Sequence, residues 1–196
     1  MSGRGLRLVL AGGGTGGHVI PAISIAQEVV RRGGEARFVG TADRIEARLV
    51  PAAGFGIDFV PVRPLAGGKA VGATRAVVAA PLSILRSLRL LRGIRPDAVL
   101  GVGGYVAGPV VLAGRLAGAA TALLEQNATI GLTNRLLARV VHRAFVTYEE
   151  TVAAFPAGAA EVTGNPVKPS IVEAAKRARS AAGGPVRVLV MGGSQG

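Results

Sequence analysis

The sequence predicts an α/β fold, a Rossmann-like parallel sheet with helices on both faces. Short apolar segments of strand type alternate with helical segments along nearly the whole chain, and the links between them are short. Three predicted strands end in glycine-rich segments, at 12–17, 101–108 and 192–196. Because right-handed crossovers place all strand-exit loops of a parallel sheet along one edge, we expect these loops to share that edge.

The individual elements are predicted from hydrophobic periodicity and from residues that begin or end helices. The predicted strands are 6–11, 36–39, 57–60, 98–102, 121–124, 143–146, 161–163 and 186–191. The predicted helices are 21–32, 43–50, 74–92, 109–116, 133–139, 149–154 and 170–180. Pro51 should end the second helix, and Pro81 predicts a break or a new first turn within the third. The segment 61–72, rich in Pro and Gly, is predicted to be a loop.

Composition limits the class of protein. The chain has 196 residues, of which 49% are hydrophobic but only 4% aromatic, so we expect a core of Ala, Val, Leu and Ile. It has no cysteine, which excludes disulfides and makes a cytosolic protein the simplest interpretation. We expect no signal peptide, because the N-terminus leads directly into a strand. We also expect no membrane span, because glycines and a proline interrupt the charge-free stretch 98–114.

The net charge of +12 narrows the choice of partner. Such an excess of Lys and Arg predicts attraction to nucleic acid, to an anionic membrane face or to phosphorylated substrates. Nucleic acid is disfavoured, because the basic residues are scattered mostly over helices without interleaved aromatic side chains for base stacking. We therefore expect no nucleic-acid partner.

The first glycine-rich segment, GGGTGGH at 12–18, predicts a phosphate site. It joins a strand to a helix, where glycine lets the backbone approach a ligand and free N–H groups favour an anion. It satisfies GxGxxG, but a dinucleotide site needs an acid at the end of the second strand, and Gly40-Thr41-Ala42 stand there before Asp43. The segment is not a P-loop either, because His18 stands where a P-loop requires Lys. A tight turn without ligand is the remaining alternative.

The second glycine-rich loop repeats this arrangement. Gly103, Gly104 and Tyr105 follow the strand at 98–102, and Pro109 can set the first turn of the next helix. The loop can offer N–H groups to a second oxyanion. Close packing of a helix on the sheet, which small residues permit, is the alternative explanation.

Five segments together carry a resemblance to a known family. They are GGGTGGHVIPA (12–22), GVGGYVAGP (101–109), LLEQNATIGLTNR (123–135), TGNPVK (163–168) and GGSQG (192–196). In this order, and over essentially the whole chain, they closely resemble the MurG family of bacterial peptidoglycan N-acetylglucosaminyltransferases. The family transfers N-acetylglucosamine from UDP-N-acetylglucosamine to undecaprenyl-pyrophosphoryl-N-acetylmuramyl-pentapeptide (lipid I) and so forms lipid II.

The resemblance implies a GT-B architecture of two Rossmann-like domains with the active site between them. Residues 1–168 would be the N-terminal, acceptor-side domain, 169–184 a connecting helix and linker, and 185–196 the first strand and glycine loop of a truncated donor-binding domain. The implied contacts to the donor are Thr15, Gly16, Gly17, Asn127, Lys168 and Ser194. The family commonly has Arg where Lys168 stands, and Lys keeps the charge but loses the bidentate fork. The implied loops for the acceptor diphosphate contain Gly13 and Gly14, and then Gly103, Gly104 and Tyr105.

His18 is the candidate catalytic base. It stands at the start of a helix, where the positive end of the dipole favours the neutral ring that accepts a proton. An inverting transfer needs a base near the acceptor hydroxyl, and His18 is either that base or orients the sugar hydroxyl or phosphate. A histidine that only caps the helix, with its hydrogen bonds satisfied, is the alternative. His142 is interpreted as structural.

No metal site is expected. The only aspartates, Asp43, Asp58 and Asp97, form no DxD motif, so we expect metal-independent transfer with no metal site and no cofactor.

A membrane surface is the remaining expected partner. On the helix at 74–92, Ile84, Leu88 and Leu91 share one face that should be core. The membrane patch predicted for the other face consists of Lys69, Arg75, Leu82, Arg86, Arg89 and Leu90. Leucines beside basic residues suit a lipid interface, although a solvated basic face is the alternative.

We therefore expect a hexosyltransferase, an inverting N-acetylglucosaminyltransferase that lies peripherally on the cytoplasmic face of the bacterial membrane. Its expected partners are UDP-N-acetylglucosamine, the undecaprenyl-linked acceptor lipid I and an anionic membrane surface. One alternative is that the chain alone is a non-catalytic binding module for a lipid-linked diphosphate or a membrane. A nicotinamide-dependent oxidoreductase is the third interpretation, which the position of Asp43 supports poorly.

Overall fold

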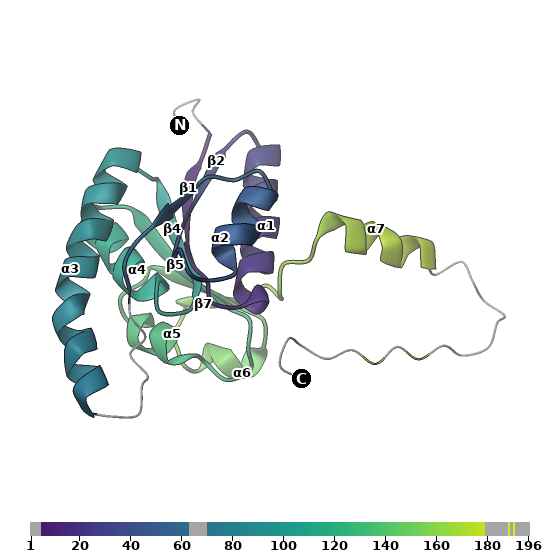
Figure 1. Cartoon of the computed structure of the whole chain (residues 1–196). Helices are drawn as coiled ribbons and strands as arrows, with labels where there is room; N and C mark the ends of the chain where they lie inside the picture. The colour runs from purple at the N-terminus through teal and green to yellow at the C-terminus, as the bar shows by residue number, and fades with distance from the viewer. Residues whose placement is uncertain (1–4, 63–69, 179–187, 189, 191–196) are drawn as a thin grey trace.

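Seven strands form one parallel sheet in the order β3-β2-β1-β4-β5-β6-β7. This computed structural model describes residues 5–62, 70–178, 188 and 190, and the side chains of all of these except 70–80, 169 and 178. Helices cover both faces of the sheet (Figure 1), so the predicted α/β fold with a Rossmann-like parallel sheet is confirmed. The strands are β1 (Arg7–Gly12), β2 (Glu35–Gly40), β3 (Ile57–Phe59), β4 (Ala98–Gly103), β5 (Ala120–Glu125), β6 (Arg143–Val146) and β7 (Ala160–Val162). The helices are α1 (Gly16–Arg31), α2 (Glu46–Ala52), α3 (Ala70–Ile94), α4 (Ala107–Leu116), α5 (Leu132–Leu137), α6 (Glu149–Val152) and α7 (Pro169–Ala178).

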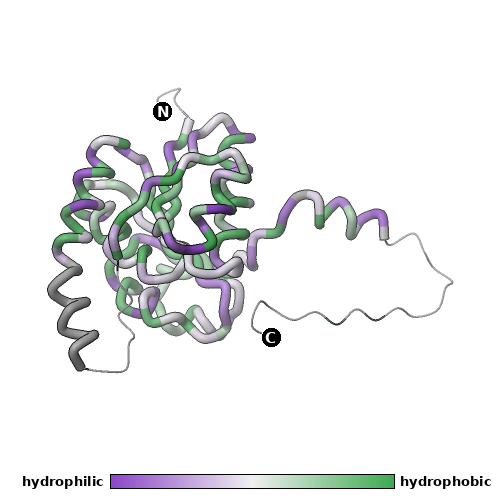
Figure 2. Tube along the Cα trace, viewed as in Figure 1, coloured by the Kyte–Doolittle hydropathy of each residue, from purple (hydrophilic) through white to green (hydrophobic). Residues whose placement is uncertain are grey.

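The core consists of two apolar clusters, one on each face of the sheet. Successive side chains of β1 point to opposite faces, so Leu8 and Leu10 join one cluster and Val9 and Ala11 the other. The first cluster contains residues of α1 and α2, whereas the second contains residues of α3, α4 and α5. Figure 2 shows the corresponding pattern, with hydrophobic residues concentrated on the central strands. Burial on both faces explains why the strands read as continuous apolar runs.

The strand order reverses between β1 and β4. From β1 the chain continues through β2 to β3 on one side, and from β4 it continues to β7 on the other. In open α/β sheets, ligands bind outside the carboxyl ends of the strands at such a reversal. The segments that follow β1 and β4 are the two glycine-rich loops.

Several helix boundaries differ from the sequence prediction, and three of the differences involve a proline. Helix α1 begins at Gly16 rather than at Pro21, α2 runs from Glu46 to Ala52 with Pro51 inside it, and α3 passes Pro81 without the predicted break. A proline inside a helix removes one hydrogen bond and its ring crowds the carbonyl of residue i−4, a cost that other contacts of the helix can offset. Pro51 stands one residue before the end of α2, so the helix has almost ended where the proline interrupts it. In α1 and α3 the packing of the remaining residues retains the helix.

The C-terminal part of the described chain leaves the sheet. After β7 the chain runs to α7, which extends away from the rest of the molecule in Figure 1. Ile171 and Val172 of this helix are 55% and 44% exposed. The predicted strand at 186–191 lies outside the described residues except for Val188 and Val190.

Candidate functional site

The two glycine-rich loops meet at the carboxyl ends of β1 and β4. The N–H of Gly13 donates to the carbonyl of Gly103 over 3.4 Å. A Cβ added to Gly104, whose φ is +76°, would lie 2.6 Å from the carbonyl oxygen of Gly13. Only glycine permits both this backbone conformation and this approach. The prediction that these two loops share one sheet edge is therefore confirmed, while the third loop, 192–196, lies outside the described residues.

The backbone N–H groups of the first loop divide into two sets. Those of Gly13 and Gly14 already have protein acceptors, the carbonyl of Gly103 and the carboxylate of Glu46. For Thr15, Gly16 and Gly17, at the start of α1, the described part of the chain supplies no acceptor. These three groups stand at the positive end of the helix dipole, so an anion is the ligand they suit.

His18 lies between the two loops. Its Nδ1 is 3.3 Å from the carbonyl oxygen of Gly13 and 3.3 Å from Oγ1 of Thr15. The opposite edge of the ring faces the second loop, because a Cβ built on Gly103 would be 2.6 Å from both Nε2 and Cδ2. The side chain is half-buried. Tyr105, also predicted as a site residue, is half-buried in the second loop.

Glu46 is a residue of this site that the sequence did not indicate. Its side chain is 1% exposed, and its carboxylate lies directly behind the first loop. Oε2 accepts the N–H of Gly14 over 2.9 Å, and Oε1 accepts the N–H and the hydroxyl of Thr41 over 3.1 and 2.8 Å. A Cβ on Gly13 would collide with this carboxylate. The only signal in the sequence was an acid at a core-facing position of a short helix.

The third strand end, after β5, carries a network centred on Glu125. Its buried carboxylate accepts hydrogen bonds from the backbone N–H and the side-chain amide of Asn127, from the N–H of Gly131 and from the side-chain amide of Asn134. Next to it, Gln126 Nε2 donates to the carbonyl of Val102 in β4 over 3.0 Å. Asn127 is thus held, exposed, at the strand end beside the second glycine loop.

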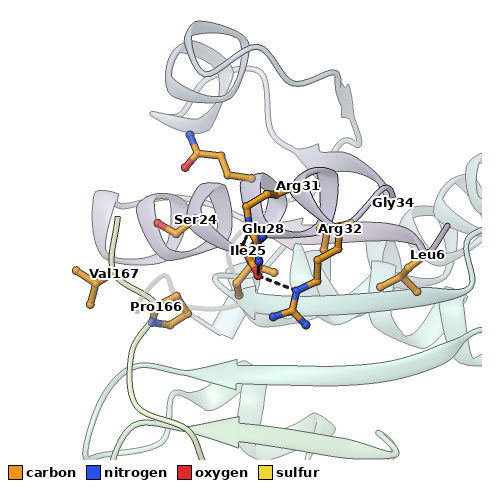
Figure 3. A pocket seen from close by; sticks show the side chains of 11 residues that line it. Leu6, Ser24, Ile25, Glu28, Arg31, Arg32, Gly34, Pro166 and Val167 are labelled. Carbon is orange, nitrogen blue, oxygen red and sulfur yellow. Dashed lines mark hydrogen bonds and ion pairs between the residues drawn. The ribbon is translucent and has the colours of Figure 1, made fainter. Parts of the chain in front are cut away.

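Lys168, a predicted contact to the UDP-linked sugar donor, is not brought to the loops. Lys168 is exposed immediately before α7. Its neighbours Pro166 and Val167 line a cavity of about 570 Å³ beside α1 (Figure 3), together with Ser24, Ile25 and the ion-paired Glu28. None of the glycine-loop residues lines this cavity. Ser194 lies outside the described residues.

The outward face of α3 agrees only in part with the predicted membrane patch. Leu82 is 51% exposed, and Arg86 and Arg89 are exposed on the same face. The assignment of Leu90 to this patch is corrected, because Leu90 is half-buried and packs against the core cluster. Leu85, also 51% exposed, extends the apolar part instead. The predicted core face is confirmed: Leu91 is fully buried, and Ile84 and Leu88 pack against the core. Lys69 and the side chain of Arg75 lie outside the described residues.

The described residues contain neither a metal-binding cluster nor a membrane-spanning helix. No three acidic or histidine side chains gather there as a metal-binding group. None of the described helices combines the length and the apolar character that crossing a bilayer requires.

Comparisons with known proteins agree with this geometry. The family model described as the glycosyltransferase family 28 N-terminal domain matches residues 8–146. An Anaeromyxobacter dehalogenans protein is 49% identical over 193 residues and a Shewanella protein, from strain ANA-3, is 39% identical over 196 residues. Both are named UDP-N-acetylglucosamine--N-acetylmuramyl-(pentapeptide) pyrophosphoryl-undecaprenol N-acetylglucosamine transferase. The alignments cover 97% and 100% of this chain but 50% and 53% of those proteins, so the chain spans about half the length of the curated relatives it matches.

A solved structure supports the same relationship. The crystal structure of Acinetobacter baumannii MurG superposes with a TM-score of 0.76 and 31% sequence identity. The match covers 97% of this chain and 53% of that one. The resemblance inferred from the five sequence segments is therefore confirmed.

Proposed function

The chain belongs to glycosyltransferase family 28 through its N-terminal domain, and from this we propose that it forms the acceptor-binding half of an N-acetylglucosaminyltransferase of peptidoglycan synthesis. The reaction is transfer of N-acetylglucosamine from UDP-N-acetylglucosamine to undecaprenyl-pyrophosphoryl-N-acetylmuramyl-pentapeptide, forming lipid II. The relatives' names specify this donor and this lipid-linked acceptor.

One observation carries the proposal: two glycine loops lie side by side at the reversal of the strand order. The N–H groups of Thr15, Gly16 and Gly17 at the start of α1 have no acceptor in the described part of the chain. A diphosphate, which UDP-N-acetylglucosamine and the lipid-linked acceptor both contain, needs several such N–H groups and favours the positive end of a helix dipole. Gly13 and Gly14, whose own N–H groups are occupied, shape the loop rather than donate to the ligand.

His18 is the catalytic base in this proposal. As the acceptor hydroxyl oxygen attacks the anomeric carbon of N-acetylglucosamine, the bond to UDP breaks and the hydroxyl proton passes to His18 Nε2. The inversion at the anomeric carbon follows from this single displacement. General-base catalysis of this kind contributes about 10²- to 10⁴-fold to the rate. The geometry that supports the assignment is an Nδ1 atom bonded within the first loop and an Nε2 atom directed toward the second.

Binding of the sugar donor requires the C-terminal half of the relatives, of which this chain matches only the beginning. We assign residues 1–168 to the acceptor-side domain, 169–184 to a connecting helix and linker, and 185–196 to the start of the donor-binding domain. Thr15, Gly16, Gly17, Asn127, Lys168 and Ser194 are the proposed donor contacts. The exposed Ile171 and Val172 of α7 are suited to pack against that second half.

The membrane partner is proposed on the outward face of α3. Exposed Leu82 and Leu85 adjoin exposed Arg86 and Arg89, so apolar side chains can enter the headgroup region while the arginines meet anionic lipid. We therefore propose that the protein lies peripherally on the cytoplasmic face of the membrane, where its polyprenyl-linked acceptor would be found.

Transfer of labelled N-acetylglucosamine to a short-chain lipid I analogue tests the function. The 196-residue chain is assayed for transfer and, separately, for binding of the analogue, with His18→Ala as the control in both. We expect the chain alone to bind the analogue without turnover, because it spans only half the length of its relatives. By itself it would be a binding module. Addition of a donor-binding half from a relative should restore turnover only when His18 is present. A wild-type chain that does not bind the analogue would contradict the proposal.

A further inference from the structure

A continuous chain of hydrogen bonds runs from Glu46 to His18 through one peptide unit. The N–H of Gly14 donates to Glu46 Oε2 over 2.9 Å. The carbonyl of the same peptide, that of Gly13, lies 3.3 Å from Nδ1 of His18. The peptide between Gly13 and Gly14 is therefore held at its N–H end by a buried carboxylate and at its carbonyl end by the imidazole.

The direction of this peptide determines which ring nitrogen of His18 carries the proton. A carbonyl oxygen only accepts, so the contact with Gly13 is a hydrogen bond only when Nδ1 carries the proton, whereas the hydroxyl of Thr15, also 3.3 Å from Nδ1, can donate or accept and fits either tautomer. In the neutral ring, Nε2 is then the free acceptor, and it is the atom that faces Gly103. If this peptide flipped, its N–H would point at the ring and favour the tautomer with the proton on Nε2.

Glu46 opposes that turn. Both of its oxygens accept, and the N–H and hydroxyl of Thr41 fix the carboxylate from the other side. After a turn of the peptide, the carbonyl of Gly13 would face this carboxylate, acceptor against acceptor, in a region where Glu46 is 1% exposed. An unpaired contact of this kind is costly because water cannot reach it.

We propose that Glu46 is a positioning residue that sets the tautomer of His18: by fixing the Gly13–Gly14 peptide, it keeps the proton on Nδ1 and leaves Nε2 free. The inference rests on the proposed function of His18 as the base, for which a free Nε2 is required. Glu46 touches neither ring nor substrate and acts only through the peptide.

The test is a ¹⁵N NMR measurement of the imidazole nitrogens in the 196-residue chain. The sequence has two histidines, so His18→Ala assigns the signals. His142 is the internal reference, because it lies immediately before β6 and therefore at the amino-terminal ends of the strands, away from the glycine loops. In the unchanged chain we expect the neutral His18 ring to carry its proton on Nδ1. Finding it on Nε2 would overturn the proposal without any variant.

Glu46→Gln is the variant that releases the peptide. Its carboxamide has one acceptor oxygen for three donors, and its NH₂ group can donate to a turned Gly13 carbonyl. We expect the His18 signals to move toward the other tautomer and the Gly14 amide to exchange with solvent about tenfold faster or more. Thr41→Val is the matched control, because it removes one bond to Glu46 but leaves the bond to Gly14. Unchanged His18 signals in Glu46→Gln, or equal shifts in both variants, would overturn the role of Glu46.

Failure of this inference is distinguishable from failure of the proposed function. Binding of the short-chain lipid I analogue to the unchanged chain is measured in the same samples. Absence of binding would contradict the proposed function, whereas binding together with unchanged His18 signals in Glu46→Gln would contradict only the assignment of Glu46.

Discussion

The imidazole of His18 lies directly against the backbone of Gly103. A Cβ built on Gly103 would be 2.6 Å from both Nε2 and Cδ2 of the ring, and the φ of Gly103 is +108°. The second glycine loop therefore confines the same ring that the first loop holds through Nδ1. A base with one nitrogen bonded and the other confined has little freedom to turn, which is the preorganisation that proton transfer requires.

This relationship predicts that Gly103→Ala displaces His18. The added methyl group would overlap the ring, so we expect weaker binding of the short-chain lipid I analogue and an altered His18 imidazole signal. The positive φ adds backbone strain of about 1–3 kcal/mol in the free energy of unfolding. Calorimetric binding and urea unfolding measure the two effects.

Gly118→Ala separates strain from displacement. Gly118 also has a positive φ, +81°, but a Cβ there would meet no atom within 4 Å. We expect this control to lose stability while keeping its affinity for the analogue. If the two alanine variants bound the analogue equally well, the contact between Gly103 and His18 would have no part in the site.

Glu125→Gln should loosen the loop that carries Asn127. The carboxylate accepts four hydrogen bonds, from Asn127, Gly131 and Asn134, and a carboxamide offers only one acceptor oxygen for them. Because the group is buried, we expect the free energy of unfolding to fall by about 2–3 kcal/mol. Urea unfolding measures the loss, and hydrogen exchange of the Gly131 amide locates it.

Glu161→Gln is the matched control for this change. Glu161 is exposed on β7, so the same substitution should alter the free energy of unfolding by no more than about 0.5 kcal/mol. Equal losses of unfolding free energy in the two variants would show that the hydrogen-bond network around Glu125 does not stabilise the fold.

Acid should weaken the end of α1. Hydrogen bonds from Arg31 and then Arg32 lower the pKa of Glu28 from 4.5 to about 2. A carboxyl group with a lowered pKa stabilises the folded state above its unfolded value and loses that contribution as pH falls from about 4.5 to about 2. In Glu28→Gln, unfolding free energies should therefore change less over this range than in the unchanged chain.

The expected difference is small and sensitive to salt. The side chain of Glu28 is 40% exposed and those of both arginines more so, which screens the ion pairs. Urea unfolding at about pH 5.5 and about pH 3, in low and high salt, measures it. Glu35→Gln, at an exposed site with no ion pair among the described residues, should leave the pH dependence unchanged. A pH dependence in Glu28→Gln identical to that of the unchanged chain would contradict the prediction.

The fold was predictable because its signals are local. Strands β1, β4 and β5 are continuous apolar runs followed by glycine or polar residues, and buried parallel strands need little else to be recognised. The helix boundaries at Pro21, Pro51 and Pro81 were wrong, because the cost of a proline depends on how many other contacts hold the helix. Those contacts come from the sheet and not from the neighbouring sequence.

The candidate site was predictable only as far as its loops. Glycine-rich segments after strands indicate an anion site, but which N–H groups remain free depends on Glu46, which lies 32 residues from Gly14 in the chain. Leu90 was assigned to the wrong face for a related reason. A helical wheel gives the angle of a side chain, and the elements packed on α3 determine how wide the buried face is.

Membrane binding should depend on Arg86 and Arg89 more than on charge in general. Replacing both with Gln should reduce binding to vesicles that contain anionic phosphatidylglycerol by about fivefold for each arginine, because each contributes about 1 kcal/mol at a charged surface. Leu82→Ser with Leu85→Ser should reduce it further by removing apolar side chains from the headgroup region. Vesicle flotation measures the bound fraction.

The control for this prediction has the same change in net charge. Arg48→Gln with Arg139→Gln removes two exposed arginines from α2 and from the segment after α5. With a net charge of +12, any such loss weakens attraction to anionic lipid somewhat. If the face of α3 is the contact, the α3 variant loses binding and the control retains most of it, because charges at the surface act within a Debye length. Equal losses would mean that the protein meets the membrane through its overall charge and not through α3.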